Sequence, residues 1–282
     1  MIAFPKLFPA GQSYVRIPSS RAACMRILLE IVERGSCYWA SGTVSPDKAT
    51  ALAEKFALLY GTDVGASRRS ALRARHRAAS QVLFWPRSPT CLEWWLLVSE
   101  GDGVVHEREK LKNAGRTGER LTFLDQFRLV RRQREREKGG GRRWTWVLAP
   151  EAFERHLHTV RELSRSHGSD SRITDRLDRY LNQLRALPGF AGIREQKKEL
   201  QRAGREAWQR THREPATYPW GERIPYLSKA FACYHRPEAL KLDVLAAVMC
   251  REAQKESVAD QELAQALLEV ECGSLGLRNE DH

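Results

Sequence analysis

The chain has 282 residues, of which 42% are hydrophobic, so it can bury the core of one large domain or two smaller ones. It carries 47 Lys and Arg against 35 Asp and Glu, a net charge of +12. An excess of this size favours a polyanionic partner, above all a nucleic acid. The sequence contains no signal-peptide pattern and no run of 18 apolar residues, so we expect neither secretion by that route nor a membrane span.

The cysteines argue against a metal centre or a disulfide framework. They are scattered without a CxxC pair, whereas a zinc site needs clustered ligands. The six are Cys24, Cys37, Cys91, Cys233, Cys250 and Cys272. We therefore expect no metal and no cofactor, and a chain that works in the reducing cytoplasm.

The first 150 residues alternate between helix and strand patterns. Helices are predicted over residues 21–34, after a Ser-Ser cap, and over residues 47–60, behind Pro46. Strands are predicted over residues 37–44, 81–85, 92–100, 121–132 and 142–149, with a short helix at 107–114. This succession predicts an α+β domain over residues 1–150, with a ferredoxin-like or RRM-like antiparallel sheet.

Residues 151–282 are predicted to form a second, mainly helical domain. Helices are expected over residues 150–165, 172–187, 193–213, 237–255 and 260–270. Residues 252–282 contain eight acidic and only two basic residues. The positive charge is therefore concentrated in the earlier part of the chain.

The strongest candidate for nucleic-acid binding is the run RLVRRQREREKGGGRR at residues 128–143, expected at the tip of a hairpin. It holds eight basic and two acidic residues, and its three glycines allow many tip conformations. Arginines here can reach along a phosphate chain or into a groove, and a base could stack on a neighbouring tryptophan. The candidates are Arg128, Arg131, Arg132, Arg134, Arg136, Arg142, Arg143 and Trp144. Trp146 shares a strand face with Trp144, and we expect one of the two in the core. The alternative is a charged hairpin tip that is merely solvated.

A second basic run covers residues 68–87, with six arginines and no acidic residue. Its first part, RRSALRARHR, fits a helix or a strand equally well. Arg68, Arg69, Arg73 and Arg75 are the candidate phosphate ligands here. A solvated face explains them equally well.

His156 and His158, followed by Tyr180, suggest the metal site and nucleophile of single-strand nicking enzymes. That site needs both imidazoles on one side of a strand, where residues i and i+2 point the same way. The surrounding pattern is helical, which places the two rings about 200° apart. We therefore expect two surface histidines.

The Arg-rich run, the Arg-studded helix at 21–34 and the Cys37-Tyr38-Trp39 that follows resemble the CRISPR RNA-processing proteins of plasmid-borne type IV systems, which belong to antiviral defence. The resemblance implies metal-independent cleavage of a repeat RNA by attack of a 2′-hydroxyl on the adjacent phosphate. It also implies retention of the product in a ribonucleoprotein complex. Such cleavage needs a base, an acid and a cation, and by position the candidates are Arg21, Arg26, Arg34, Tyr38 and Lys48.

Two other functions fit the composition. One is a non-catalytic DNA-binding protein of plasmid or integrative-element replication or transfer, with helices of the C-terminal half as the reading elements. The other is a basic scaffold whose arginines face an acidic protein partner.

Overall fold

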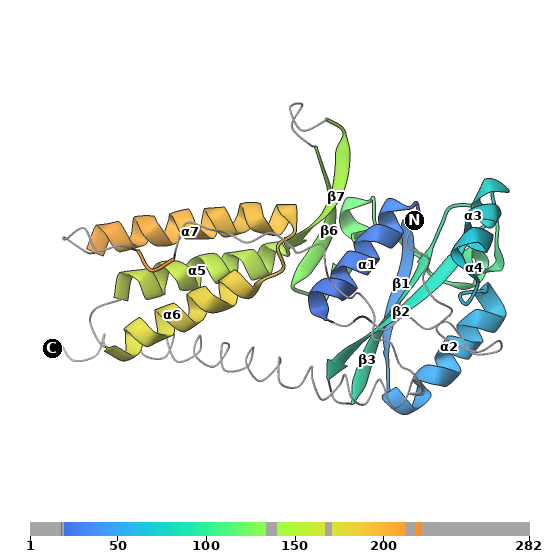
Figure 1. Cartoon of the computed structure of the whole chain (residues 1–282), viewed down its shortest axis with the longest axis horizontal. Coiled ribbons are helices and arrows are strands. Elements are labelled where there is room, and N and C mark those ends of the chain that lie inside the picture. The colour runs from blue at the N-terminus through green and yellow to red at the C-terminus, as the bar shows by residue number, and fades with distance from the viewer. Residues whose placement is uncertain are drawn as a thin grey trace. The chain divides into compact units, whose positions relative to one another are not determined.

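The computed structural model describes Pro18 and residues 20–88, 90–133, 140–166, 171–211 and 218–220. These residues divide into two compact units. The N-terminal unit comprises the described residues up to Leu124 together with Arg128–Thr145, and the helical unit comprises Asp125–Phe127 and the described residues from Trp146 onward. The prediction of an α+β chain with antiparallel sheet is confirmed (Figure 1).

A four-stranded antiparallel sheet of order β2-β3-β1-β4 organises the N-terminal unit. Its strands are β1 (Tyr38–Val44), β2 (Ser80–Ser88), β3 (Cys91–Val98) and β4 (Lys112–Asn113). The chain forms α2 (Pro46–Tyr60) and α3 (Ala66–Ala74) between β1 and β2, and α4 (Val104–Arg108) between β3 and β4.

Two elements of this unit show how tertiary pairing decides ambiguous sequence. The short helix predicted near residues 107–114 lies earlier in the chain, because α4 spans Val104–Arg108 and Lys112–Asn113 pairs with Trp39 and Tyr38 of β1. The ambiguous run at 68–77 begins as a helix, α3. In both places the local pattern is too short to fix the element from the sequence alone.

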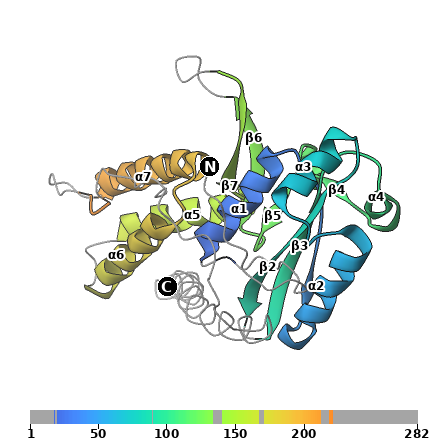
Figure 2. The ribbon, with the colours of Figure 1, turned by 45° about the vertical axis from the view of Figure 1, so that its right-hand side comes forward.

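The sheet is covered on both faces. On one face, α2 packs Ala49, Ala53 and Phe56 against alternate residues of β2 and β3. The opposite face carries the buried side chains of Trp39, Leu83, Trp95 and Leu97. Figures 1 and 2 show α1 (Arg21–Glu33) on this second side and α2 on the first.

The two long helices of the N-terminal unit start and stop as predicted. The Ser20 hydroxyl accepts a hydrogen bond from the amide of Ala23 at 3.2 Å, which caps α1. Pro46 occupies the first turn of α2, and Gly61 ends that helix with a left-handed φ of 62°.

A second sheet has the order β5-β6-β7, with β5 (Thr122–Phe123), β6 (Phe127–Gln133) and β7 (Arg142–Leu148), and the short helix η1 (Thr117–Glu119) precedes it. The single strand predicted over residues 121–132 is wrong at its centre. Leu124 and Asp125 have φ angles of 50° and 55°, so the chain turns there. The Phe123 ring stacks on Trp95 with 5.4 Å between centroids, which anchors β5 on the second face of the first sheet.

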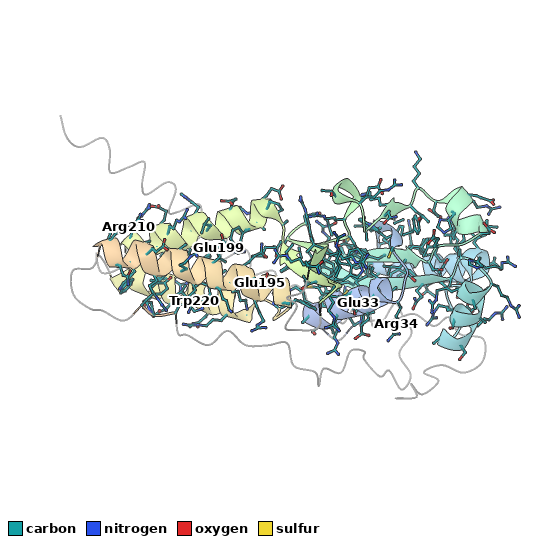
Figure 3. The ribbon with its side chains drawn as sticks, turned by 90° about the horizontal axis from the view of Figure 1, so that it is seen from above. Glu33, Arg34, Glu195, Glu199, Arg210 and Trp220 are labelled. Carbon is teal, nitrogen blue, oxygen red and sulfur yellow. The ribbon has the colours of Figure 1, made fainter. Side chains whose placement is uncertain are left out.

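The helical unit is built from α5 (Pro150–Ser166), α6 (Ser171–Ala186) and α7 (Ala191–Thr211), with α5 packed against both others. The buried Tyr218 hydroxyl lies 3.2 Å from the Ser164 hydroxyl. A Cβ at Gly204 would lie 2.0 Å from the Tyr218 hydroxyl oxygen, so α7 needs glycine at this position. Figure 3 shows Glu195, Glu199 and Arg210 along α7.

A buried lysine, Lys197, caps the C-terminal end of α6. Lys197 is fully buried, and its ammonium donates to the carbonyls of Arg185 at 2.8 Å and Leu187 at 2.6 Å. These carbonyls lack partners within the helix, so the lysine caps them. The helices predicted over residues 237–255 and 260–270 lie outside the described residues.

Candidate nucleic-acid interface

The distal half of the β6–β7 hairpin exposes four arginines. Arg131 and Arg132 lie just before Gln133 at the end of β6, Arg142 and Arg143 begin β7, and all four are exposed. The two strands extend past β5 in the view of Figure 2. Successive side chains of a strand point to opposite faces, so each face of this two-stranded ribbon presents cations.

The base of the hairpin is apolar and holds the exposed half in place. Leu129 and Val130 on β6 are buried, and Trp146 on β7 is completely buried. Trp144 is half-buried. The expectation that one of the two tryptophans lies in the core is therefore confirmed, and Trp144 is the one with surface left for a ligand.

Two predicted hairpin ligands, Arg134 and Arg136, lie outside the described residues. Arg128 is half-buried on the apolar part of β6. The glycines that precede β7, Gly140 and Gly141, have left-handed φ angles of 59° and 78°. A residue with a Cβ is strained in this conformation, so these two glycines are needed for the chain to enter β7.

The second predicted group lies on α3 and divides by exposure. Arg68 and Arg75 are exposed, and Arg73 is half-buried. Arg69 is buried, with 7% of its surface exposed, and its guanidinium donates to the carbonyl of Val64. Its position suits a structural role, because a buried guanidinium already bonded to backbone has little freedom to meet a phosphate.

The five predicted catalytic residues do not meet at one place. Arg26 and Arg34 both pair with Glu30, with nitrogen–oxygen distances of 3.0 Å and 3.8 Å. Arg21 is half-buried at the first position of α1, and Lys48 is exposed on α2.

Tyr38 lies on the α2 side of the sheet, against the apolar core there. Its ring meets His106 edge-on, with 5.0 Å between centroids. The alternation of β1 and the position of α1 therefore separate Tyr38 from the α1 arginines.

Two titratable residues of the helical unit, His156 and Tyr180, are paired with each other. His156 Nδ1 lies 2.8 Å from the Tyr180 hydroxyl, and burial lowers the pKa of His156 to about 4. Burial also raises the pKa of Tyr180. His158 lies two residues further along α5, about 200° around the helix from His156, and it is exposed. The expectation of two surface histidines is thus wrong for His156, because Tyr180 gives its ring a partner in the interior.

One cation next to the hairpin sheet was missed by the sequence reasoning. The Lys112 ammonium lies 4.9 Å from the centroid of the Trp39 ring, and the Trp39 indole donates to the carbonyl of Glu119 at 2.8 Å. A strand of two residues has no alternation to detect, so only the pairing of β4 with β1 reveals this contact.

No helix in the described part of the chain combines the length and apolar character needed to cross a membrane. Within the same ranges, no three His, Cys, Asp or Glu side chains gather in a way that could hold a metal ion. No protein-family model, curated protein or solved structure matches the chain. Its functional interpretation therefore depends on its own residues and their geometry.

Proposed function

We propose that the protein binds RNA through the distal half of the β6–β7 hairpin. The observation that carries the proposal is the exposure of Arg131, Arg132, Arg142 and Arg143 on two adjacent strands. No acidic residue occurs in residues 128–133 or 140–145, so the described part of the hairpin carries positive charge only. A guanidinium binds phosphate through two hydrogen bonds and stacks on bases, which suits single-stranded or hairpin RNA.

We further propose that the N-terminal unit is built on a ferredoxin-like or RRM-like plan. The strand order β2-β3-β1-β4 supports this, as do α2 and Val105 of α4 in a single core on one face. RRM domains stack bases on the other face of the sheet. Here that face holds buried Trp39, Trp95 and Phe123, so its aromatic rings are core. This leaves the hairpin as the better candidate for contact with RNA.

The resemblance implies that the protein processes a repeat RNA in a ribonucleoprotein complex. We propose this activity only in addition to RNA binding. The five predicted catalytic residues are divided between the α1 side and the α2 side of the sheet. Binding needs exposed cations, which are present. Cleavage needs a base, an acid and a cation within reach of one phosphate.

The test is RNA binding measured by fluorescence anisotropy over a range of salt. Each phosphate contact contributes about −0.7 to the slope of log affinity against log salt for single strands and about −0.9 for duplexes. Replacing the four exposed arginines together (R131Q/R132Q/R142Q/R143Q) should weaken binding strongly and flatten this slope by about 3. The melting temperature should stay near that of the native chain, because these side chains are exposed.

A matched control loses the same charge elsewhere. Lys55, Arg161, Lys198 and Arg210 are exposed on α2, α5 and α7. Their fourfold replacement by Gln should change the affinity only through the net charge. Equal losses in the two variants would assign binding to overall charge and contradict a hairpin site. A flat salt response of the native chain would overturn the proposal as a whole.

One observation favours DNA as a second candidate ligand. The hairpin is a two-stranded ribbon, and the major groove of B-form DNA is wide enough to admit such a ribbon. A-form RNA has a deep, narrow major groove, so RNA would have to meet the hairpin at a loop, a bulge or a single strand. Competition between hairpin RNA and duplex DNA of the same sequence separates the two, since tighter binding to DNA would favour this candidate.

A further inference from the structure

The segment that joins β4 to β5 carries a second group of cations. Lys112 and Arg116 are exposed and Arg120 is half-buried, with Glu119 the only acidic residue among residues 110–124. We refer to Lys112, Arg116 and Arg120 as the β4 edge cations. They lie outside both Arg-rich runs of the sequence.

Hydrogen bonds hold this segment in a fixed shape. The amide of Ala114 donates to the carbonyl of Cys37 at 2.9 Å, and the amide of Asn113 donates to the Glu119 carboxylate at 2.7 Å. The Trp39 indole donates to the carbonyl of Glu119, which secures the far end of the turn. The cations are therefore carried on an ordered loop, which lowers the entropic cost of placing them on a ligand.

Glu119, the only carboxylate among residues 110–124, already has hydrogen-bond and ion-pair partners. Glu119 accepts the amide of Asn113 and lies 3.6 Å from the Arg116 guanidinium, which is 73% exposed. An ion pair this exposed is weak, so Arg116 can exchange it for a phosphate at small cost. Together with Lys110, the three cations outnumber the single carboxylate of residues 110–124, which leaves the segment with a positive excess.

Backbone pairing brings the segment next to the hairpin. The amide of Leu129 on β6 donates to the carbonyl of Leu121 at 2.8 Å. The chain turns at Leu124 and Asp125, so the residues before the turn run back alongside β6. Arg120 precedes Leu121 and therefore lies beside the part of β6 that follows Leu129 and leads to Arg131.

The surroundings of Cys37 support the same placement. Burial raises the pKa of the Cys37 thiol, and the positive charge of Arg131 partly opposes this rise. Cys37 is also the residue whose carbonyl binds the amide of Ala114. The charge of Arg131 is therefore felt at the strand end to which the turn beginning at Lys112 is bonded.

We propose that the β4 edge cations form a second RNA-backbone contact, continuous with the hairpin, so that one RNA strand passes from Arg131 along the edge of β4. This inference rests on the proposed function, since it extends the same binding surface. The ligand is the phosphate chain of the RNA segment next to the one held by the hairpin, and its bases are not read here. The Lys112 ammonium lies over the Trp39 ring, on the same side of the sheet as β5.

The experiment compares four proteins on the same RNA over a range of salt. They are the native chain, the hairpin variant R131Q/R132Q/R142Q/R143Q, the edge variant K112Q/R116Q/R120Q and the control K55Q/K198Q/R210Q, which loses the same charge as the edge variant. The edge variant should lose at least tenfold in affinity relative to the control. Its salt slope should fall by about 2, the value for three phosphate contacts to a single strand.

A series of RNA lengths gives a second readout. The affinity of the native chain should rise with length until the strand spans both contacts, and the edge variant should reach its plateau at a shorter RNA. If the edge variant does not fold, because Lys112 covers Trp39, the double variant R116Q/R120Q leaves that contact intact and should show a slope smaller by about 1.4.

The outcomes separate the two proposals. A native chain without salt-dependent binding would overturn the proposed function. The edge contact alone would be overturned by a different result. In that result the hairpin variant loses binding, whereas the edge variant binds like the control and shows the same length dependence as the native chain. A fall in slope and a shorter plateau in the edge variant would support it.

Discussion

Among the described residues, arginines differ in exposure and pairing, although the sequence presents its Arg-rich runs as equivalent. Arg69 is buried and bonded to the carbonyl of Val64. Arg26 and Arg34 share Glu30 on α1, in ion pairs exposed enough to contribute little stability. Arg131 and Arg142 are exposed on the hairpin. The hairpin arginines differ from the others in lying together on two adjacent strands, where several guanidiniums can meet one polyanion.

His156 is the residue whose charge state matters most for the helical unit. His156 is half-buried on α5, and its Nδ1 lies 2.8 Å from the hydroxyl of Tyr180 on α6. Burial lowers its pKa to about 4, below the ordinary value of 6.5. The unfolded chain therefore binds more protons than the folded chain between pH 6.5 and pH 4, and the free energy of unfolding falls as the pH drops through this window.

We predict that urea unfolding will show a loss on the order of 1–2 kcal/mol between pH 6.5 and pH 5 that depends on His156. The variant His156→Asn keeps an acceptor near the Tyr180 hydroxyl but cannot titrate, so its pH dependence should be weaker over the same window. Equal pH dependence in the two proteins would show that His156 does not titrate as proposed.

At the scale of elements, the side chain of Gln196 on α7 is hydrogen-bonded to the end of β7. The Gln196 carboxamide accepts the amide of Leu148 at 2.7 Å and donates to the carbonyl of Leu148 at 3.3 Å. It thus takes the place of a neighbouring strand for the last residue of β7. An unpaired backbone group at such a partly buried position costs about 1–3 kcal/mol.

We predict that Gln196→Leu will lower the free energy of unfolding by about 1–3 kcal/mol, since it leaves both backbone groups of Leu148 without this partner. Gln196→Glu keeps an acceptor for the amide and loses the donor, so its loss should be smaller. Chemical denaturation of the three proteins gives the comparison. Equal stability of the Leu and Glu variants would contradict the pairing.

Long amphipathic helices were predictable element by element, and short strands were not. α1 and α2 begin and end where Ser20, Pro46 and Gly61 indicate. β4 has two residues and exists because β1 lies beside it. β5 and β6 occur in one apolar run, and the turn at Leu124 and Asp125 contains no glycine or proline to mark it.

At the scale of the whole molecule, the charge of +12 and the hairpin act over different ranges. The net charge attracts any polyanion over about a Debye length, some 8–10 Å at physiological salt. Specific placement of a strand needs short contacts such as those proposed for the hairpin. The salt dependence of binding therefore separates the long-range attraction from the short contacts at the hairpin only when a charge-matched variant is measured under the same conditions.

If RNA processing accompanies binding, we predict that cleavage of the cognate repeat RNA proceeds in EDTA and leaves a 2′,3′-cyclic phosphate or its opened product. Arginine stabilises the negative charge of the phosphorane, and loss of one such contact should lower the rate by about 10²–10³. A 2′-deoxy substitution at the scissile position removes the nucleophile and should stop the reaction. Cleavage that needs added metal, or that survives the 2′-deoxy substitution, would refute this mechanism.

The sequence by itself determined the α+β class, the positive charge and the ends of α1 and α2, because composition, caps and periodicity act over a few neighbouring residues. Tertiary structure alone decided which arginines are buried, that Tyr38 and the α1 arginines lie on different sides of the sheet, and that Leu121 meets Leu129. These contacts join residues far apart in the chain. They form only when the packing of both sheets offsets the entropy of closing the intervening loops, and no local pattern records that balance.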